Sequence, residues 1–70
     1  QKDDLWFSFF VVAELHFINK SFLEAEEYYL KSYQSFQKLS LEQKSEADGF
    51  FRFIKARLYE LISKRNTSVS

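Results

Sequence analysis

The feature that most restricts how this chain can fold is its near lack of proline and glycine, the residues that most strongly mark turns. Its 70 residues include no proline and a single glycine, Gly49. An all-β fold needs such residues at every hairpin, so this chain is a poor candidate for that class. Hydrophobic residues make up 46% of the chain and charged residues 29%, which is enough apolar material for a packed core. The sequence therefore predicts a small all-α domain.

Apolar spacing and polar breaks predict three helices, at about residues 3–18, 21–38 and 41–65. Connections of only two or three residues require consecutive helices to be antiparallel neighbours, which makes two successive helical hairpins. We expect one module over residues 1–65 and a small, polar, frayed tail over residues 66–70. Because the chain does not begin with methionine, we also expect it to be part of a longer protein.

Capping signals support these boundaries. Asp3 and Asp4 suit the positive end of the first helix dipole. Two capping boxes are expected at the starts of the second and third helices, at Ser21-x-x-Glu24 and Ser40-x-x-Gln43. Gly49 lies inside the third predicted helix, where glycine costs about 1 kcal/mol relative to alanine. A kink or a close contact with another helix is therefore expected at Gly49.

The second and third predicted helices each carry an apolar stripe at helical spacing. A thinner second stripe, Leu23 and Leu30, lies on another side of the second helix. The residues of the two main stripes are Phe22, Ala25, Tyr29, Tyr33 and Phe36, and then Ala47, Phe50, Phe51, Ile54, Leu58, Leu61 and Ile62.

The first predicted helix differs because it is apolar in every direction. Between Leu5 and Ile18 only Ser8, Glu14 and His16 interrupt the apolar residues, and these three point to separate sides. A helix that is apolar all round is expected to be buried. Two partner helices cannot cover a whole cylinder, so we expect neighbouring repeats or a second copy of the chain to cover the rest.

Charge and composition exclude several functional classes. Ten basic residues balance ten acidic residues, which removes the electrostatic basis for binding nucleic acid or an anionic membrane. The longest apolar run is shorter than the roughly 20 residues of a membrane span. There is no cysteine for a disulfide or a thiolate metal site. We therefore expect a cytoplasmic protein that binds neither nucleic acid nor membrane.

No arrangement of residues indicates catalysis. His16 is the only histidine and has no second ligand at a metal-binding spacing, so a packed or rim position is expected for it. Glu24, Glu26 and Glu27 fit a solvated helix N-terminus, with Glu27 paired to Lys31 one turn later. One glycine cannot form a glycine-rich phosphate loop. We expect no enzymatic activity, no metal and no cofactor.

The segment from Phe9 to Ser32 resembles a tetratricopeptide repeat. Large, small and aromatic residues recur at the intervals of that pattern, namely at Phe9, Ala13, Phe22, Ala25, Tyr29 and Ser32. The resemblance implies stacked helical hairpins that bind a peptide or protein on a concave surface. The interval from Ala13 to Ala56 exceeds the usual period of about 34 residues, and Ala47 and Ala56 compete for the small position, so the register of the second unit stays open.

One branch of that family is similar in more detail. The aromatic-rich run from Trp6 to Phe10, followed by Phe17, Lys20, Phe22 and Ala25, resembles peptide-sensing regulators of Gram-positive bacteria. These are the response-regulator aspartate phosphatases and related quorum-sensing regulators. The resemblance implies a role in signalling, but the phosphatase residues of that family lie largely in a preceding bundle, so none is transferred to this chain.

A second resemblance is to microtubule-interacting-and-transport domains. These are three-helix bundles of about this length, with an aromatic-alanine pattern like that of Phe22 to Ala25 at the start of their second helix. The resemblance implies binding of helical tail motifs in a groove between helices. The first helix of those domains is amphipathic, however, whereas here it is apolar all round.

In the tetratricopeptide register the first helix lines the concave surface. The residues then expected to face a bound peptide or the next subunit are Phe7, Phe10, Glu14 and Phe17. The leading hypothesis is a non-catalytic interaction module that binds a peptide or protein, as part of a peptide-sensing regulator. The rival hypothesis is a structural module that self-associates through the same helix into a homo-oligomer.

Overall fold

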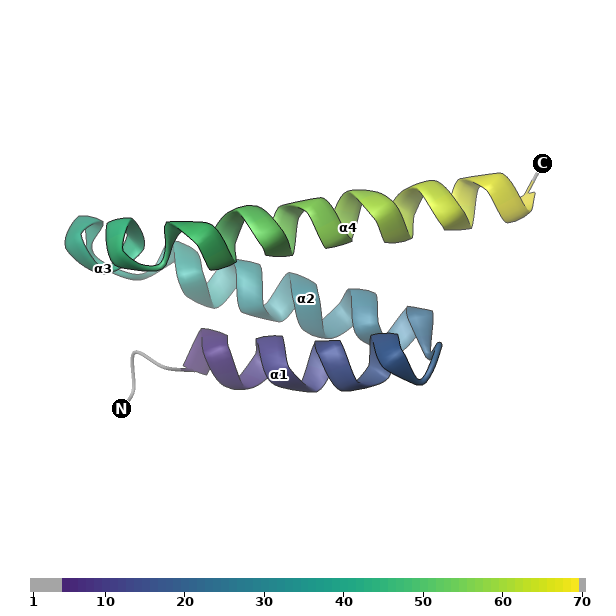
Figure 1. Ribbon diagram of the computed structural model, residues 1–70, viewed down its shortest axis with the longest axis horizontal. Helices are drawn as coiled ribbons and strands as arrows, with labels where there is room; N and C mark the ends of the chain where they lie inside the picture. Colours follow the sequence, from purple (N-terminus) through teal and green to yellow (C-terminus); the bar gives the residue numbers. More distant parts are fainter. Residues whose placement is uncertain (1–4, 70) are drawn as a thin grey trace.

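The chain forms four helices in the computed structural model, which describes residues 5–69, with side chains described for residues 5–65 (Figure 1). They are α1 (Leu5–Ile18), α2 (Phe22–Gln37), α3 (Leu41–Glu46) and α4 (Asp48–Val69). No strand occurs within residues 5–69. The predicted all-α class is confirmed. Asp3 and Asp4, expected to cap the first helix, lie outside the described residues.

The three long helices lie side by side, with α2 between α1 and α4 in the view of Figure 1. In the view of Figure 1 the chain runs from left to right along α1 and returns along α2. After the short α3, it runs along α4 in the same direction as α1. Consecutive long helices are therefore antiparallel, as the short connections predicted. Both α1 and α4 pack against α2.

Small residues form the contact between α1 and α2. Ala13 on α1 and Ala25 and Ser32 on α2 are completely buried. Small side chains let two helix backbones approach closely. The Ser32 hydroxyl donates a hydrogen bond of 2.7 Å to the backbone carbonyl of Trp6, which ties the middle of α2 to the first turn of α1. A buried hydroxyl with a partner avoids the cost of an unsatisfied polar group.

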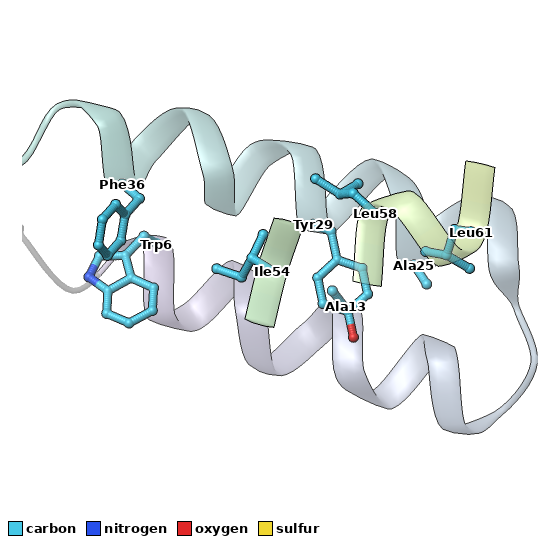
Figure 2. Packing of buried hydrophobic residues seen from close by; sticks show 8 residues of the cluster. All are labelled: Trp6, Ala13, Ala25, Tyr29, Phe36, Ile54, Leu58 and Leu61. Carbon is cyan, nitrogen blue, oxygen red and sulfur yellow. The ribbon is translucent and has the colours of Figure 1, made fainter. Parts of the chain in front are cut away.

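The hydrophobic core lies along α2 and is completed by α4 (Figure 2). Tyr29 and Phe36 of α2 and Ile54 of α4 are almost fully buried, as their apolar stripes predicted. Three other members of the predicted stripes, Phe22, Phe50 and Ile62, are exposed, so the stripes are confirmed only in part. At one end Phe36 stacks on Phe51 with ring centroids 4.7 Å apart and meets the edge of Trp6 at 5.2 Å. The buried hydrophobic residues are Trp6, Ala13, Ala25, Tyr29, Phe36, Ile54, Leu58 and Leu61.

The prediction of one helix over residues 41–65 is wrong in detail, because two helices occupy this region. The break falls at Ala47, whose φ of −110° and ψ of 23° leave the helical region. Asp48 and Gly49 follow it, and both are poor residues for a helix interior, while Asp48 suits the start of a new helix. A Cβ at Gly49 would meet nothing within 4 Å, so the close helix contact expected there is absent. Helix α4 also extends to Val69, beyond the predicted end.

One of the two predicted capping boxes is confirmed. At the start of α3, the Ser40 side chain accepts from the Gln43 backbone N–H, and the Gln43 side chain accepts from the Ser40 backbone N–H, both at 3.2 Å. Ser21 makes no side-chain cap for α2. An N-cap residue normally has an extended backbone. Ser40 has a ψ of 164° but Ser21 has a ψ of 74°, which explains the difference.

The conformation of Ser21 follows from the way α1 ends. Lys20 takes a left-handed conformation with a φ of 64°. Its N–H donates to the Phe17 carbonyl at 3.0 Å, and the Ser21 N–H donates to the His16 carbonyl at 2.8 Å. This pair of hydrogen bonds is a Schellman motif, in which the left-handed position is usually glycine. The Ser21 N–H is thus used to close α1 and is not available to the Glu24 side chain for a capping box, while the Ser21 carbonyl accepts from the Ala25 N–H of α2 at 2.9 Å.

As expected, the partner helices within this chain leave much of α1 uncovered. Only Trp6 and Ala13 of α1 are buried. Its neighbours α2 and α4 cover two sides of the helix and leave the rest open, because two helices cannot enclose a third. The large apolar side chains of α1 that remain exposed are Leu5, Phe7, Val11, Leu15 and Ile18.

Candidate interaction groove between α1 and α4

An open apolar groove of about 520 Å³ lies between α1 and α4. Phe10 of α1 meets the rings of Phe50 and Phe53 of α4 edge-on, at centroid distances of 5.6 and 5.7 Å. These large rings fill the space between two helices that both pack against α2, and they present their outer sides to solvent. The lining residues are Phe10, Glu46, Gly49, Phe50 and Phe53.

Two features of the α3–α4 junction shape the groove. Gly49 contributes no side chain, and a Cβ there would meet nothing, so the groove is open where other residues would fill it. Glu46 is exposed at the rim and makes no ion pair among the described side chains. The groove therefore combines apolar walls with one uncompensated negative charge.

Arg57 joins all three long helices beside Phe53. Its guanidinium lies between the rings of Phe17 and Phe53, with its central carbon 3.9 and 4.6 Å from their centroids. The Nε atom donates a hydrogen bond of 3.2 Å to the Tyr29 hydroxyl. Its terminal nitrogens lie 3.5 Å from carboxylate oxygens of Glu14 and of Glu60. One half-buried cation thus links α1, α2 and α4.

Burial raises the pKa of Tyr29 to about 12, against an ordinary value of 10.0. The hydrogen bond from Arg57 favours the phenolate and opposes this rise, whereas the neighbouring Glu14 carboxylate adds to it. Burial alone would lower the pKa of Arg57, but its interactions with Tyr29, Glu14 and Glu60 outweigh that effect and raise it. The phenol is neutral and the guanidinium charged at any physiological pH, so the linkage is a fixed structural contact.

The structure separates the four residues predicted to contact a partner. Phe10 lines the groove, and the exposed Phe7 lies against Phe50 at the same end, with centroids 5.9 Å apart. Glu14 is turned towards Arg57, and one of its oxygens is buried without a hydrogen-bond partner. Phe17 is covered by Arg57 and by the edge of Phe22. Phe7 and Phe10 remain candidate contact residues, whereas Glu14 and Phe17 belong to the contact between α1 and α4.

The α4 side of the groove was missed by sequence analysis. Phe50 had been assigned to the core face of its helix, and Phe53 lay off that face. Phe50 follows Gly49 directly and Phe53 comes three residues later, so a glycine beside two aromatics on one helix side was the available signal. The contribution of Glu46 depends on the break at Ala47, which the sequence pattern did not predict.

The remaining polar residues of interest have structural partners. His16 stacks on Tyr28, with centroids 5.6 Å apart and an interplanar angle of 17°, in the packed role expected for it. Glu27 pairs with Lys31 at 3.6 Å as predicted, and Glu26 accepts two hydrogen bonds of 3.1 Å from Arg65. Among the described residues no group of three potential ligands could hold a metal ion.

Fold and groove together define a small all-α helical module with an open apolar groove between parallel helices. No protein-family model, curated protein or solved structure matches the chain. None of the helices in the part of the chain that the structure describes is long and apolar enough to cross a membrane.

Proposed function

We propose that this chain is a non-catalytic protein-interaction module that binds a peptide segment of a partner in the groove between α1 and α4. The observation that carries the proposal is the groove itself, whose walls are three aromatic rings left partly in water. Aromatic side chains are enriched among the residues that contribute most to binding. Exposed apolar surface concentrated in a groove is typical of an interaction site.

The chemistry of the groove specifies the kind of peptide. Phe10, Phe50 and Phe53 favour a bulky aliphatic or aromatic anchor, which would lie over Gly49 where no side chain obstructs it. Glu46 at the rim favours a lysine or arginine beside that anchor. Glu46 makes no ion pair with any described side chain, so its carboxylate can pair with a basic residue of the peptide. The proposed ligand is therefore a peptide with an apolar anchor next to a basic residue.

The tetratricopeptide-like architecture is part of the same proposal. The small residues of the resemblance, Ala13 on α1 and Ala25 and Ser32 on α2, are completely buried, and their burial supports this part of the proposal. The interruption at Ala47 is a departure from that pattern. A role in a cytoplasmic, peptide-sensing bacterial regulator, and the rival resemblance to microtubule-interacting-and-transport domains, remain predictions from sequence.

The experiment selects binders from a random-peptide display library and compares variants at Gly49. Gly49→Leu should place a side chain in the groove and weaken binding of the selected peptides by at least about tenfold. Gly49→Ala is the matched control, because it gives a similar gain in helix propensity with little obstruction. Fluorescence anisotropy with labelled peptides measures the dissociation constants, and circular dichroism checks the fold.

Charge preference gives a second readout from the same library. Selection on Glu46→Lys should lose the basic residue beside the anchor and enrich acidic residues in its place. If no peptide is enriched on the wild type, or if Gly49→Leu and Gly49→Ala bind the selected peptides equally well, the groove is not the binding site.

A further inference from the structure

The side of α1 that faces away from α2 and α4 is an uncharged apolar surface, separate from the groove. Four of its residues leave 41 to 70% of their area in water, namely Leu5, Val11, Leu15 and Ile18. Val12 lies among them, and the exposed Ser8 is the only polar side chain on this side. Glu14 and His16 point elsewhere, towards Arg57 and Tyr28. We call these six residues the outer face of α1.

The outer face is complementary to itself under a two-fold rotation. If two copies of α1 cross antiparallel about the midpoint between Val11 and Val12, residues whose numbers add up to 23 lie opposite one another. Ser8 of each copy then lies opposite Leu15 of the other. The smallest side chain of the face thus receives one of its largest, and this happens twice. Leu5 lies opposite Ile18 in the same way.

We propose that the outer face of α1 binds a second copy of this chain in an antiparallel homodimer. No charged group on this face opposes the approach of the second copy, and the chain as a whole has zero net charge. A helix of 14 residues is about 21 Å long, so this contact is smaller than the roughly 800 Å² per partner of a standard stable interface. The dimer is therefore expected to dissociate in the micromolar to millimolar range.

The first test is sedimentation velocity of the full chain from about 1 μM to about 1 mM, a range that spans the expected dissociation constant. The wild type should change from one to two chains per particle with rising concentration. Leu15→Glu should remain monomeric, because it places a charge on the contact. Leu23→Glu is the matched control on α2, since Leu23 is 73% exposed and lies away from α1's outer face, and it should dimerise like the wild type.

The second test examines the pairing itself. Ser8→Arg alone should also be monomeric, because the long side chain would lie against Leu15 in both halves of the interface. Mixed with Leu15→Glu, it should form a heterodimer, since one new arginine then lies opposite one new glutamate and the second Ser8–Leu15 pair is intact. Ile18→Glu, also on the exposed face, provides a further monomeric variant if Leu15→Glu loses its helical circular dichroism.

Three results would overturn the proposal. The first is a wild type that stays monomeric at all concentrations, and the second is a dimer that persists in both Leu15→Glu and Ile18→Glu. The third is the failure of Ser8→Arg and Leu15→Glu to form a mixed dimer, which would refute the antiparallel pairing. Peptide binding in the groove involves the opposite side of α1, so it should survive in Leu15→Glu whatever the outcome.

Discussion

Removal of the Arg57 side chain should destabilise this fold more than removal of any other basic side chain that the structure describes. Arg57 contacts α1 and α2 from its position on α4, and its side chain is only 21% exposed. By contrast, Arg52 on the same helix is 79% exposed, and its one assigned partner is Asp48, one turn away at 2.8 Å. Arg57→Ala and Arg52→Ala therefore make a matched pair.

The expected cost of Arg57→Ala is about 3 kcal/mol of unfolding free energy, from three sources. Two cation–π contacts, with Phe17 and Phe53, contribute about 0.5–1 kcal/mol each. Loss of the hydrogen bond leaves the buried Tyr29 hydroxyl without its donor, at about 1 kcal/mol or more. Glu14 loses its counter-charge in a half-buried position, which adds a smaller amount because solvent still screens it.

Urea unfolding followed by circular dichroism, at concentrations low enough to keep the chain monomeric, measures both variants. A 70-residue domain has a total stability of roughly 4–10 kcal/mol, so Arg57→Ala should remain measurable, though close to the limit. Arg52→Ala should cost about 0.5 kcal/mol or less. Arg57→Lys should restore less than half of the loss, because an ammonium lacks the planar, multi-donor geometry. If Arg57→Ala costs no more than Arg52→Ala, the linkage does not stabilise the fold.

Two further changes test other local arguments. The pKa of Tyr29 is raised to about 12 in the folded chain, so the folded state holds the phenol proton more tightly than the unfolded state. The contribution of this group to the free energy of unfolding is complete below pH 10 and should fall by about 2–3 kcal/mol between pH 10 and pH 12. Tyr29→Phe should remove this part of the decline and the phenolate absorbance step near pH 12; a step that persists in the variant would assign the raised pKa to another tyrosine. Lys20→Gly should stabilise the fold by about 0.5–1 kcal/mol in thermal unfolding, because Lys20 has a left-handed φ of 64°. Lys38→Gly is the control at a right-handed C-cap and should destabilise the fold. Equal effects of the two glycines would refute the argument.

The amphipathic helices were predictable because each buries a single face. The core side of α2 is marked by the part of its predicted stripe from Ala25 to Phe36, and that of α4 by the part from Ile54 to Leu61. The stripe members Phe22, Phe50 and Ile62 are exposed. Helix ends were less predictable. Ser21 and Ser40 have equivalent sequence signals, yet only Ser40 caps, because the turn at Lys20 sets the backbone of Ser21. A capping signal describes one helix start, whereas the conformation depends on how the preceding helix ends.

Helix α1 shows why a pattern without periodicity predicts that contacts exist but not which side makes them. Its apolar residues point in all directions, so the sequence indicated correctly that two partner helices would leave part of it open. The sequence could not indicate which side of α1 contacts α2, which contacts α4 and which faces solvent. In the structure Ala13 faces α2, Phe10 faces α4, and Leu15 faces solvent. Each side has its own distinguishing feature: a small alanine at the close helix contact, a phenylalanine that lines the groove, and an outer face whose only polar member is Ser8. The two proposed interactions use different sides of this helix, so a charge introduced at Leu15 and a side chain introduced at Gly49 should separate them within one chain.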